Sequence, residues 1–402
     1  MTDTISSTRK SSGRIIYIIY NLLHFTALYA ARPYISLLAS ANGADGIEIS
    51  AIVSSYSIAQ VLCAIPAGKL IDRMGSRIPS IGGALLFLLG VTGLSFGRSL
   101  FFIAVCTMMT GVSHVIVLLA GQYAMTGMES GERRGKYVGM LFFTNSAGTF
   151  IGPSFGAYMQ ELLGVNRGFL GAVAAGSLCL AVAMFVPDSR ARKNEGKSVQ
   201  LSAVLGNKPI VKTILVNGMF LFTSEVIVNY FPLYAKEIGL PIMVTGVVFS
   251  ANGLMQMVVR PFLGRIAMIF KRDRLLQICL LAGGLGILCY GLAESYWQFL
   301  IISGLTGASL GLTGPLALLL VCDISPDNMV SQVLSLRVMG NYLGQSISPI
   351  FFGFMANIFG LAPVFWISGI GLSLSTGLVS RVDYHGGTGQ KTAGGPAGST
   401  GK

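Results

Sequence analysis

The chain has 402 residues, of which 52% are of apolar types and only 11% are charged, with a mean hydropathy of +0.69. Soluble proteins carry about 25% charged residues, so this composition excludes a set of ordinary soluble domains. One membrane-spanning helix of about 20 residues takes roughly 33 residues together with its connection, which predicts about twelve spans. A transmembrane β-barrel would need alternating polarity, which the sequence lacks.

The chain has a net charge of +12, and the positions of its basic residues follow the predicted topology. Basic residues precede the first predicted span and follow the second, fourth, sixth and eighth, as with Lys69, Arg73 and Arg77 after the second. The opposite connections hold few basic residues, beside acids such as Glu48 and Glu294. By the positive-inside rule both termini are cytoplasmic. The basic excess is therefore topological, and we expect no binding of nucleic acid.

The apolar segments divide the chain into two bundles of six predicted helices, residues 15–187 and 210–380. A cytoplasmic segment, residues 1–14, precedes them, and a cytoplasmic linker, residues 188–209, joins them. Residues 381–402, rich in Gly, Thr and Ala, are predicted to form a disordered cytoplasmic tail. The predicted helices cover residues 15–41, 49–71, 80–97, 99–126, 137–163, 166–187, 210–237, 242–267, 275–293, 296–323, 332–359 and 362–380.

A repeat relates the two halves, because residues 196 positions apart match without a gap, as Tyr34 matches Tyr230 and Pro153 matches Pro349. An even number of spans in each unit makes the halves parallel, with the binding site expected between them near the midplane. The repeat therefore predicts transport by alternating access. The other matches are Leu37 with Leu233, Ala39 with Ala235, Gln60 with Gln256, Gly68 with Gly264, Asn145 with Asn341, Gly148 with Gly344, Phe155 with Phe351 and Met159 with Met355.

A motif of one acid, glycines and basic residues lies between the second and third predicted spans, and it reads Gly68-Lys69-Leu70-Ile71-Asp72-Arg73-Met74-Gly75-Ser76-Arg77. It resembles the cytoplasmic signature of the major facilitator superfamily, and the resemblance covers the chain from Ile15 to Ser380. In that family the acid contacts the start of the eleventh helix, a contact that can exist in one conformation only. The resemblance therefore implies twelve helices and a gate formed by Gly68, Asp72, Arg73, Gly75 and Arg77.

A second motif lies in the fifth predicted helix, where Gly148, Gly152, Pro153 and Gly156 form the pattern GxxxGPxxG. It resembles the signature of the family's drug and metabolite antiporters. Glycines four apart permit close helix approach, and proline can kink a helix, so the resemblance implies a gating helix. Ordinary close packing is the alternative. The segment also reads G-x-S-x-G at Ser154, a hydrolase pattern, but no strand precedes it and we expect no enzyme.

The sequence departs from the family in two places. Many proton-driven members carry an arginine in the fourth helix, where this chain has Thr107. The second copy of the cytoplasmic signature has lost its acid, because Met268 matches Asp72, although Arg260-Pro261 and Gly264-Arg265 remain. Proton coupling therefore needs residues other than that arginine.

Charges inside a bilayer are costly and usually functional, so Glu225 in the seventh predicted helix and Arg32 in the first are candidates for proton coupling and substrate binding. Glu225 lies near the middle of its helix, and its repeat counterpart is Tyr29. This register places Glu225 about one turn from Arg32 in depth. An ion pair between them would be broken by a proton or by an anionic substrate. A static structural pair, or a solvated charge, is the alternative.

Two histidines, His24 and His114, lie near half depth in the first and fourth predicted helices. Each can carry a proton near neutral pH or bind substrate, and a hydrogen-bonded packing role is the alternative. Together with Glu225 they could in principle ligate a metal, but no paired-ligand spacing supports this. We expect neither a metal nor a cofactor.

The remaining polar candidates lie in helices that line the transport cavity of the family or near their cytoplasmic ends. Arg337 in the eleventh predicted helix and Arg260 in the eighth are predicted to contact a gate or lipid headgroups. Five other residues are candidates for the cavity wall, with helix packing as the equal alternative, namely Tyr29, Tyr34, Asn217, Asn229 and Tyr230.

The sequence thus predicts an all-α integral membrane protein with twelve transmembrane helices in two six-helix repeats. We expect a monomeric secondary transporter of the bacterial inner membrane that exports a small organic compound or metabolite in exchange for protons. Its partners are then the small-molecule substrate, protons and the lipid bilayer. The alternative is a proton-driven importer of a small anionic nutrient, which Arg32 favours and the antiporter motif disfavours. A membrane receptor without transport is a further alternative.

Overall fold

The computed structural model describes residues 2–128, 132–188, 206–324 and 330–380, and every regular element in these ranges is a helix. The expected tail and most of the expected linker lie outside the described residues. The first half contains α1 (Thr2–Ala31), η1 (Arg32–Tyr34), α2 (Ile35–Ala41), α3 (Gly46–Met74), α4 (Arg77–Phe96), α5 (Leu100–Met128), α6 (Glu132–Arg167) and α7 (Leu170–Ala183). The second half contains α9 (Lys208–Glu237), α10 (Ile242–Val259), η2 (Arg260–Phe262), α11 (Leu263–Ile269), α12 (Arg272–Tyr290), α13 (Tyr296–Ile324), α14 (Val330–Phe359) and α15 (Leu361–Ser380).

Nine segments within the described ranges are long and apolar enough to cross a membrane. A tenth candidate is the pair Met140–Arg167 and Leu170–Ala183, which is bent by 108°. The outer faces of these helices carry large apolar side chains, for example Phe101, which is 80% exposed, and Leu374, which is 73% exposed. Water disfavours so much exposed apolar surface, whereas lipid accepts it.

The predicted first helix is broken rather than continuous, because the single turn η1 separates α1 from α2. Pro33 has no backbone N–H and its ring clashes with the preceding turn, which explains the break. The predicted eighth helix is broken in the same way at η2, where Pro261 follows Arg260. Both breaks thus place an arginine directly before a proline. In addition, α1 begins at Thr2, so most residues expected to precede the first span are helical.

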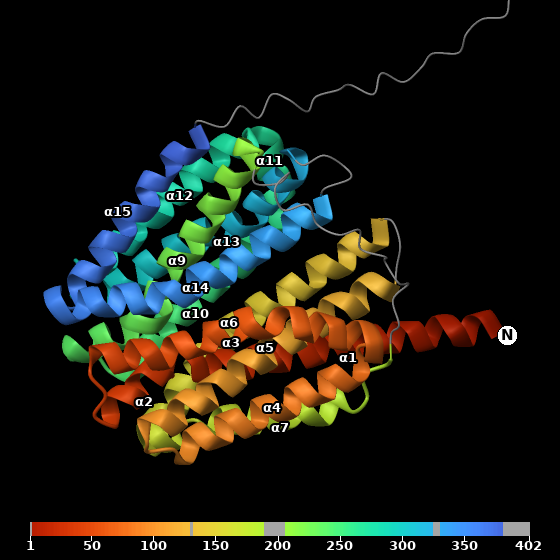
Figure 1. Ribbon diagram of the computed structural model, residues 1–402, viewed down its shortest axis with the longest axis horizontal. Coiled ribbons are helices and arrows are strands. Elements are labelled where there is room, and N and C mark those ends of the chain that lie inside the picture. The colour runs from red at the N-terminus through yellow and green to blue at the C-terminus, as the bar shows by residue number, and fades with distance from the viewer. Residues whose placement is uncertain (1, 129–131, 189–205, 325–329, 381–402) are drawn as a thin grey trace, which may run out of the picture.

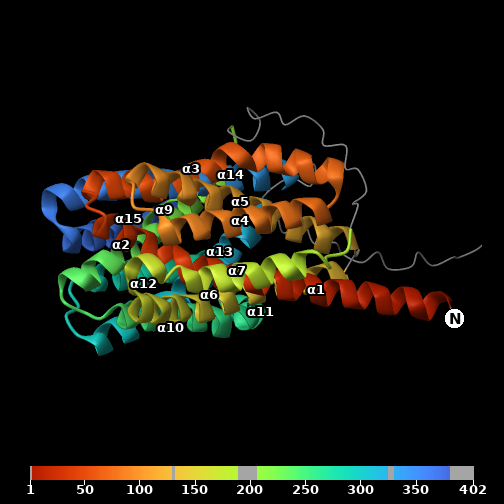
Figure 2. The same cartoon turned by 90° about the horizontal axis from the view of Figure 1, so that it is seen from below.

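The two halves form separate helix bundles that pack against each other (Figure 1). The contact between them is formed mainly by two helix pairs, α3 with α14 and α6 with α10, and α9 also contacts η1 and α2. Figure 2 shows these pairs on opposite sides of the molecule. Since the sequence repeat relates α3 to α10 and α14 to α6, the interface follows the same two-fold relationship as the sequence.

Residues related by the repeat also make the same hydrogen bonds in the two halves. The Tyr34 hydroxyl donates to the carbonyl of Pro153 at 2.7 Å, and the Tyr230 hydroxyl donates to the carbonyl of Pro349 at 2.5 Å. Likewise, the amide of Asn21 donates to Asn145, and that of Asn217 donates to Asn341. These bonds join the first helix of each half to its fifth. The two halves therefore share hydrogen-bonded contacts as well as sequence.

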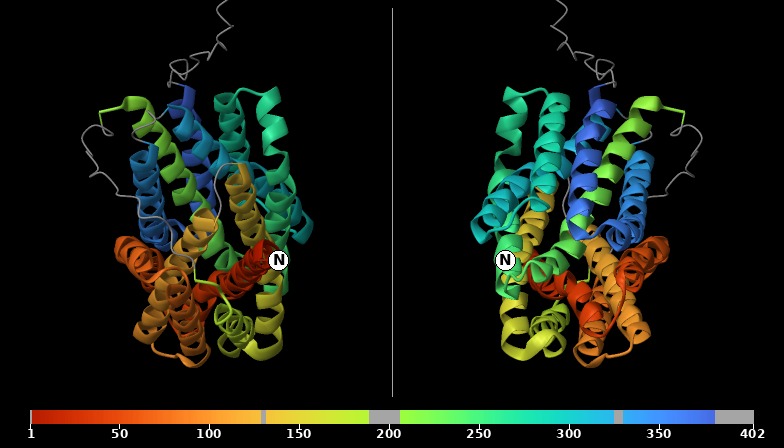
Figure 3. Two further views of the ribbon diagram at one scale, coloured as in Figure 1. Left: turned by 90° about the vertical axis from the view of Figure 1, so that its right-hand side faces the viewer. Right: turned by 90° about the vertical axis from the view of Figure 1, so that its left-hand side faces the viewer.

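The halves are in contact at one end of the molecule and diverge toward the end that holds the N terminus (Figures 1 and 3). We call the end with the α2–α3 and α9–α10 connections the closed end. There, a Cβ on Gly353 would overlap Ser50, and a Cβ on Gly246 would overlap Ala157, each across the interface. At the other end, a Cβ on Gly68 or on Gly264 would meet nothing within 4 Å. The two halves are therefore closed at one end only.

Candidate substrate-binding site

A cavity of about 250 Å³ lies between the two halves and is lined by residues from both. We call it the central cavity. Its wall combines apolar groups with amides, hydroxyls and three charged side chains. The lining residues are Tyr29, Arg32, Pro33, Thr149, Pro153, Phe220, Leu221, Ser224, Glu225, Ile227, Val228, Phe249, Asn252, Gln256, Arg260, Leu310, Gly314 and Gln345.

Arg32 and Glu225 form an ion pair across the central cavity. The Nη2 atom of Arg32 lies 2.5 Å from Oε2 of Glu225, and both side chains are at least 90% buried. Arg32 belongs to η1 in the first half, whereas Glu225 belongs to α9 in the second. The pair therefore links the halves electrostatically, as the depth argument from the repeat anticipated.

Two neighbours hold the pair in place. The guanidinium carbon of Arg32 lies 4.4 Å from the centre of the Tyr56 ring, which is a cation–π arrangement. The amide of Asn229, one turn along α9, donates to Oε2 of Glu225 at 3.2 Å. Arg32 lies in the tight turn η1, directly before Pro33. Its side chain therefore projects from the point where the first helix bends. Arg32, Glu225 and Tyr29 line the cavity, whereas Asn229 holds Glu225 without itself lining the cavity.

The two histidines lie next to each other rather than at separate sites. Nε2 of His24 is 3.4 Å from Nδ1 of His114, and the rings are stacked with centroids 5.6 Å apart. His114 also stacks on Tyr56, with centroids 6.2 Å apart, so His114 and Arg32 contact the same aromatic residue. Neither histidine lines the central cavity. The sequence did not indicate this pairing, because the two residues are far apart in the chain.

Three other candidates each bond to groups of their own half, and of these Tyr34 and Asn217 are buried whereas Arg337 is half-buried. Tyr34 is fully buried, and its hydroxyl donates a hydrogen bond to the carbonyl of Pro153. Asn217 contacts Asn341 and accepts a hydrogen bond of 3.1 Å from Nη2 of Arg337. Arg337 also donates to the carbonyl of Gly314 at 3.0 Å. In this conformation these side chains therefore connect helices of their own half.

The residues of the cytoplasmic signature lie at the end where the halves diverge. Asp72 and Arg73 are exposed in the last turn of α3. Gly75 ends this helix with a φ of 77°, a conformation that favours glycine, and its backbone lies close to Asp188. Arg77 donates to the carbonyl of Met184 at 3.0 Å. The motif thus connects the α3–α4 turn to the region after α7.

The glycines of the antiporter-like motif pack against α1 of the same half. A Cβ on Gly148 would overlap Phe25, one on Gly152 would lie 2.6 Å from the carbonyl oxygen of Thr26, and one on Gly156 would lie 2.8 Å from Cα of Ala30. The face of α6 that meets α10 carries other residues, including Ser154. The glycines therefore set the distance between α6 and α1 and do not form the contact between halves.

Ser154 shows that the hydrolase pattern in α6 is accidental. Its hydroxyl lies 2.7 Å from the hydroxyl of Ser250 in α10, and its backbone N–H donates to the same oxygen at 3.3 Å. A serine nucleophile needs a general base at this position, and a second serine is not one. The contact joins α6 and α10 across the interface.

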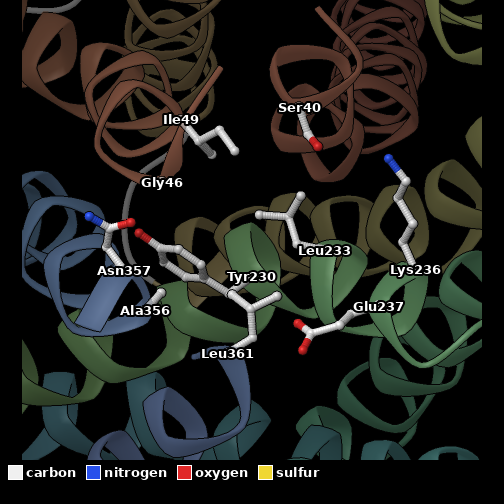
Figure 4. Close-up of a pocket in the computed structure, with 10 residues that line it drawn as sticks. All are labelled: Ser40, Gly46, Ile49, Tyr230, Leu233, Lys236, Glu237, Ala356, Asn357 and Leu361. Carbon is white, nitrogen blue, oxygen red and sulfur yellow. The ribbon is translucent and has the colours of Figure 1, made fainter. Parts of the chain in front are cut away.

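Tyr230 lies at the closed end, beside a second pocket of about 370 Å³. Figure 4 shows that its walls come from both halves, with Ser40 and Ile49 facing Tyr230 and Leu233. The Tyr230 hydroxyl is 3.1 Å from the Ser50 hydroxyl across the interface. Its repeat counterpart Tyr34 has no such contact, because the counterpart of Ser50 is a glycine, Gly246.

Several cavity residues were missed by the reasoning from sequence. Asn252, Gln256 and Gln345 bring amides into the wall, and Arg260 brings a second guanidinium. The pairing of Gln60 with Gln256 in the repeat was a signal for one of them. The sequence predicts that Arg260 contacts a gate or lipid headgroups, whereas its side chain borders the central cavity.

A site enclosed between two repeated helix bundles of this kind defines a membrane transporter rather than an enzyme. The sequence matches the Major Facilitator Superfamily over residues 17–276 and 225–397, so the chain belongs to this family. It is 24% identical over 364 residues to an uncharacterized MFS-type transporter of Methanocaldococcus jannaschii, covering 87% of this chain and 92% of that protein. It is 25% identical over 337 residues to a multi-drug resistance efflux pump PmrA homolog of Lactococcus lactis, covering 79% and 82%.

The fold is also that of solved structures. The nucleoside transporter NupG, as its D323A mutant, superposes with a TM-score of 0.78 at 12% identity, covering 92% of this chain and 99% of that one. The resemblance to the drug and metabolite branch agrees with the efflux pump named among the relatives. The protein is therefore a secondary transporter that lies, multi-pass, in the bacterial cell membrane and acts on a small molecule.

Proposed function

We propose that this transporter has twelve spans with both termini in the cytoplasm, so that the closed end faces outward and the central cavity faces the cytoplasm. The charge distribution supports this orientation. Lys69, Arg73, Arg77 and Lys271 lie at the end where the halves diverge, whereas Glu48 belongs to the closed end. In this proposal α6, α7 and α14 each cross the membrane separately.

The protein exports a small organic compound in exchange for protons, and the observation that carries this proposal is the Arg32–Glu225 pair. The pair is buried and joins the halves at 2.5 Å across the cavity. A proton on Glu225 removes the negative charge, and a bound substrate competes for the same side chains. Each event breaks the link, so the halves rearrange when either ligand is bound and resist rearrangement when the site is empty. Such mutual competition is the requirement for exchange.

Two further observations support export. The GxxxGPxxG segment from Gly148 to Gly156 resembles the motif of drug and metabolite antiporters. The Lactococcus lactis relative is named a multi-drug resistance efflux pump. The alternative, import of a small anionic compound, loses the support that Arg32 alone offered, because Glu225 neutralises that charge.

The test is proton movement in liposomes that hold the purified protein and the pH-sensitive dye pyranine. A library of small organic compounds is added without a pre-formed gradient. Compounds that are transported are expected to drive protons in the opposite direction. Proton movement in the same direction would support import instead, and transport without proton movement would contradict coupling.

The matched control is Glu237→Gln, which makes the same chemical change at an exposed position of α9. It is expected to leave compound-driven proton movement unchanged, while Glu225→Gln abolishes it. Loss of proton movement in both variants would mean that the response reflects a general effect of charge and not the buried carboxylate.

A further inference from the structure

Arg260 is the second guanidinium of the central cavity. It occupies the first position of η2, before Pro261, where the eighth helix is broken. The break that Pro261 causes parallels the one at Arg32 and Pro33, so both arginines leave the backbone at a bend. Both line the same cavity.

The two arginines differ in their partners. Arg32 contacts the carboxylate of Glu225, whereas Arg260 donates to neutral acceptors. Its Nε donates to the carbonyl of Gly311 at 3.3 Å, and its Nη2 donates to Oε1 of Gln256 at 2.8 Å. Its Nη1 donates to the hydroxyl of Ser146 and to the carbonyl of Phe142. Four donors thus face neutral oxygens, and a guanidinium has five.

The charges of the cavity wall therefore do not balance. Among the described lining residues, the charged ones are Arg32, Glu225 and Arg260, which leaves one net positive charge beside the intact ion pair. Arg260 belongs to the candidate membrane-spanning segment Ile242–Ala267. A cation in such a segment without a counter-ion is costly, and neutral hydrogen bonds offset only part of that cost. A residue with that cost in the wall of a transport cavity indicates an anionic ligand group.

The rest of the wall defines the remainder of the ligand. Phe220, Phe249 and Leu310 are apolar, and they lie on the same half as Arg260. We infer that the central cavity binds small compounds with an apolar body and a single anionic group, such as a carboxylate, and that Arg260 contacts this group. This inference rests on the proposed function only in taking the central cavity as the transport site.

The experiment uses purified protein in nanodiscs of phosphatidylcholine, which contain no anionic lipid. The probes are 1-naphthoate, 1-naphthamide and 1-naphthylmethylammonium, which share a ring system and differ in charge. We expect naphthoate to bind at least tenfold more tightly than the amide and the ammonium compound. Equal binding of the three probes, or preference for the cation, would overturn the inference.

Variants of Arg260 separate recognition from a structural role. Arg260→Gln should remove the preference for naphthoate, and Arg260→Lys should retain part of it. The matched control is Arg265→Gln, which removes the same charge at an exposed position of α11 and should leave the preference intact. If Arg260 served only to link α10 to α6, the Gln variant would bind all probes more weakly by the same factor, and the inference would be wrong.

Two further measurements complete the test. Adding phosphatidylglycerol to the nanodiscs should not displace naphthoate, and displacement would mean that a lipid headgroup occupies the site. The pyranine assay reports the proposed function independently. Proton-coupled export of neutral or cationic compounds, without any preference for anions, would overturn this inference while leaving the exchange mechanism in place. A preference for naphthoate without proton movement would do the reverse.

Discussion

Arg32 and Glu225 are brought within 2.5 Å of each other by two helices that belong to different halves of the molecule. Each side chain alone would be a buried charge in a region of low dielectric, so each depends on the other. Because the halves must separate on one side and close on the other during transport, this pair is positioned to respond to the conformational change. Its removal should affect both stability and coupling.

The first prediction separates these two effects. Glu225→Gln leaves Arg32 buried without its counter-ion, which should cost about 3–5 kcal/mol of stability. The double variant with Arg32→Gln should recover much of this loss, because neither charge is then unpaired. The measurements are the melting temperature and the flux driven by a pH gradient for both single variants and the double.

If Glu225 carries the coupled proton, the same variants should also differ from the unmodified protein in transport. Gln mimics a permanently protonated Glu225, so substrate should still bind and exchange without a gradient should persist, while gradient-driven transport is lost. The double variant should remain uncoupled even where its stability is recovered. Full gradient-driven transport by a stable Glu225→Gln protein would contradict the hypothesis that Glu225 carries the coupled proton.

The second prediction concerns the cytoplasmic signature. Asp72 is exposed in this conformation, so Asp72→Asn should leave the melting temperature unchanged. Turnover should nevertheless fall, because the contact of Asp72 with the start of α14 is expected only when this end closes. Glu161→Gln, an equivalent change at an exposed site of α6, is the control. Unchanged turnover in Asp72→Asn would remove this residue from the mechanism.

The third prediction compares two tyrosines that the repeat relates, with Tyr34 as the control for Tyr230. Tyr34→Phe and Tyr230→Phe each remove one hydrogen bond to a proline carbonyl, which should cost about 1 kcal/mol in either case. Only Tyr230 also contacts Ser50 across the closed end. Tyr230→Phe alone should therefore increase the population that is open at this end.

The readout is the distance between spin labels attached at Ile47 and Ile238, which are both exposed at the closed end. The labels are introduced in a background without native cysteines. A longer distance in Tyr230→Phe and an unchanged one in Tyr34→Phe are expected. The same shift in both variants would mean that the Ser50 contact does not hold this end closed.

The fourth prediction concerns the glycines of α6. Gly156→Ala places a methyl group against the backbone of Ala30, which should cost about 1–3 kcal/mol through overpacking. Gly121→Ala is the control, because its Cβ would meet only Asn21, at 4.0 Å. We expect a lower melting temperature for the first variant and an unchanged or slightly higher one for the second. Equal melting temperatures would show that α6 can move away from α1 at no cost.

The fifth prediction tests the orientation in the membrane. Single cysteines at Glu48 and Glu294 should react with an impermeant thiol reagent added to intact cells, and a cysteine at Lys271 should react only after the membrane is opened. All three positions are exposed. The native cysteines are replaced first, since Cys63 and Cys289 are partly exposed. The opposite labelling pattern would place the termini outside the cell.

Much of the architecture could be predicted from the sequence. Apolar helix-length segments define the spans, because a bilayer requires long runs of apolar side chains with satisfied backbone groups. The repeat register also predicted that Glu225 lies close in depth to Arg32, since related helices begin and end at related membrane levels. Pro33 and Pro261 are helix-breaking residues that the sequence also shows, but the predicted helices run through both of them without a break.

The tertiary structure alone decided which neighbour each helix face meets. Helix periodicity shows that Gly148, Gly152 and Gly156 share a face, but not that this face meets α1 instead of the other half. It also could not pair His24 with His114 or bring Arg260 into the cavity. In lipid, the outer surface of a helix is as apolar as its packed surface, so polarity does not distinguish one apolar neighbour from another. Only the packing of whole helices, set by shape and a few polar contacts, makes that choice.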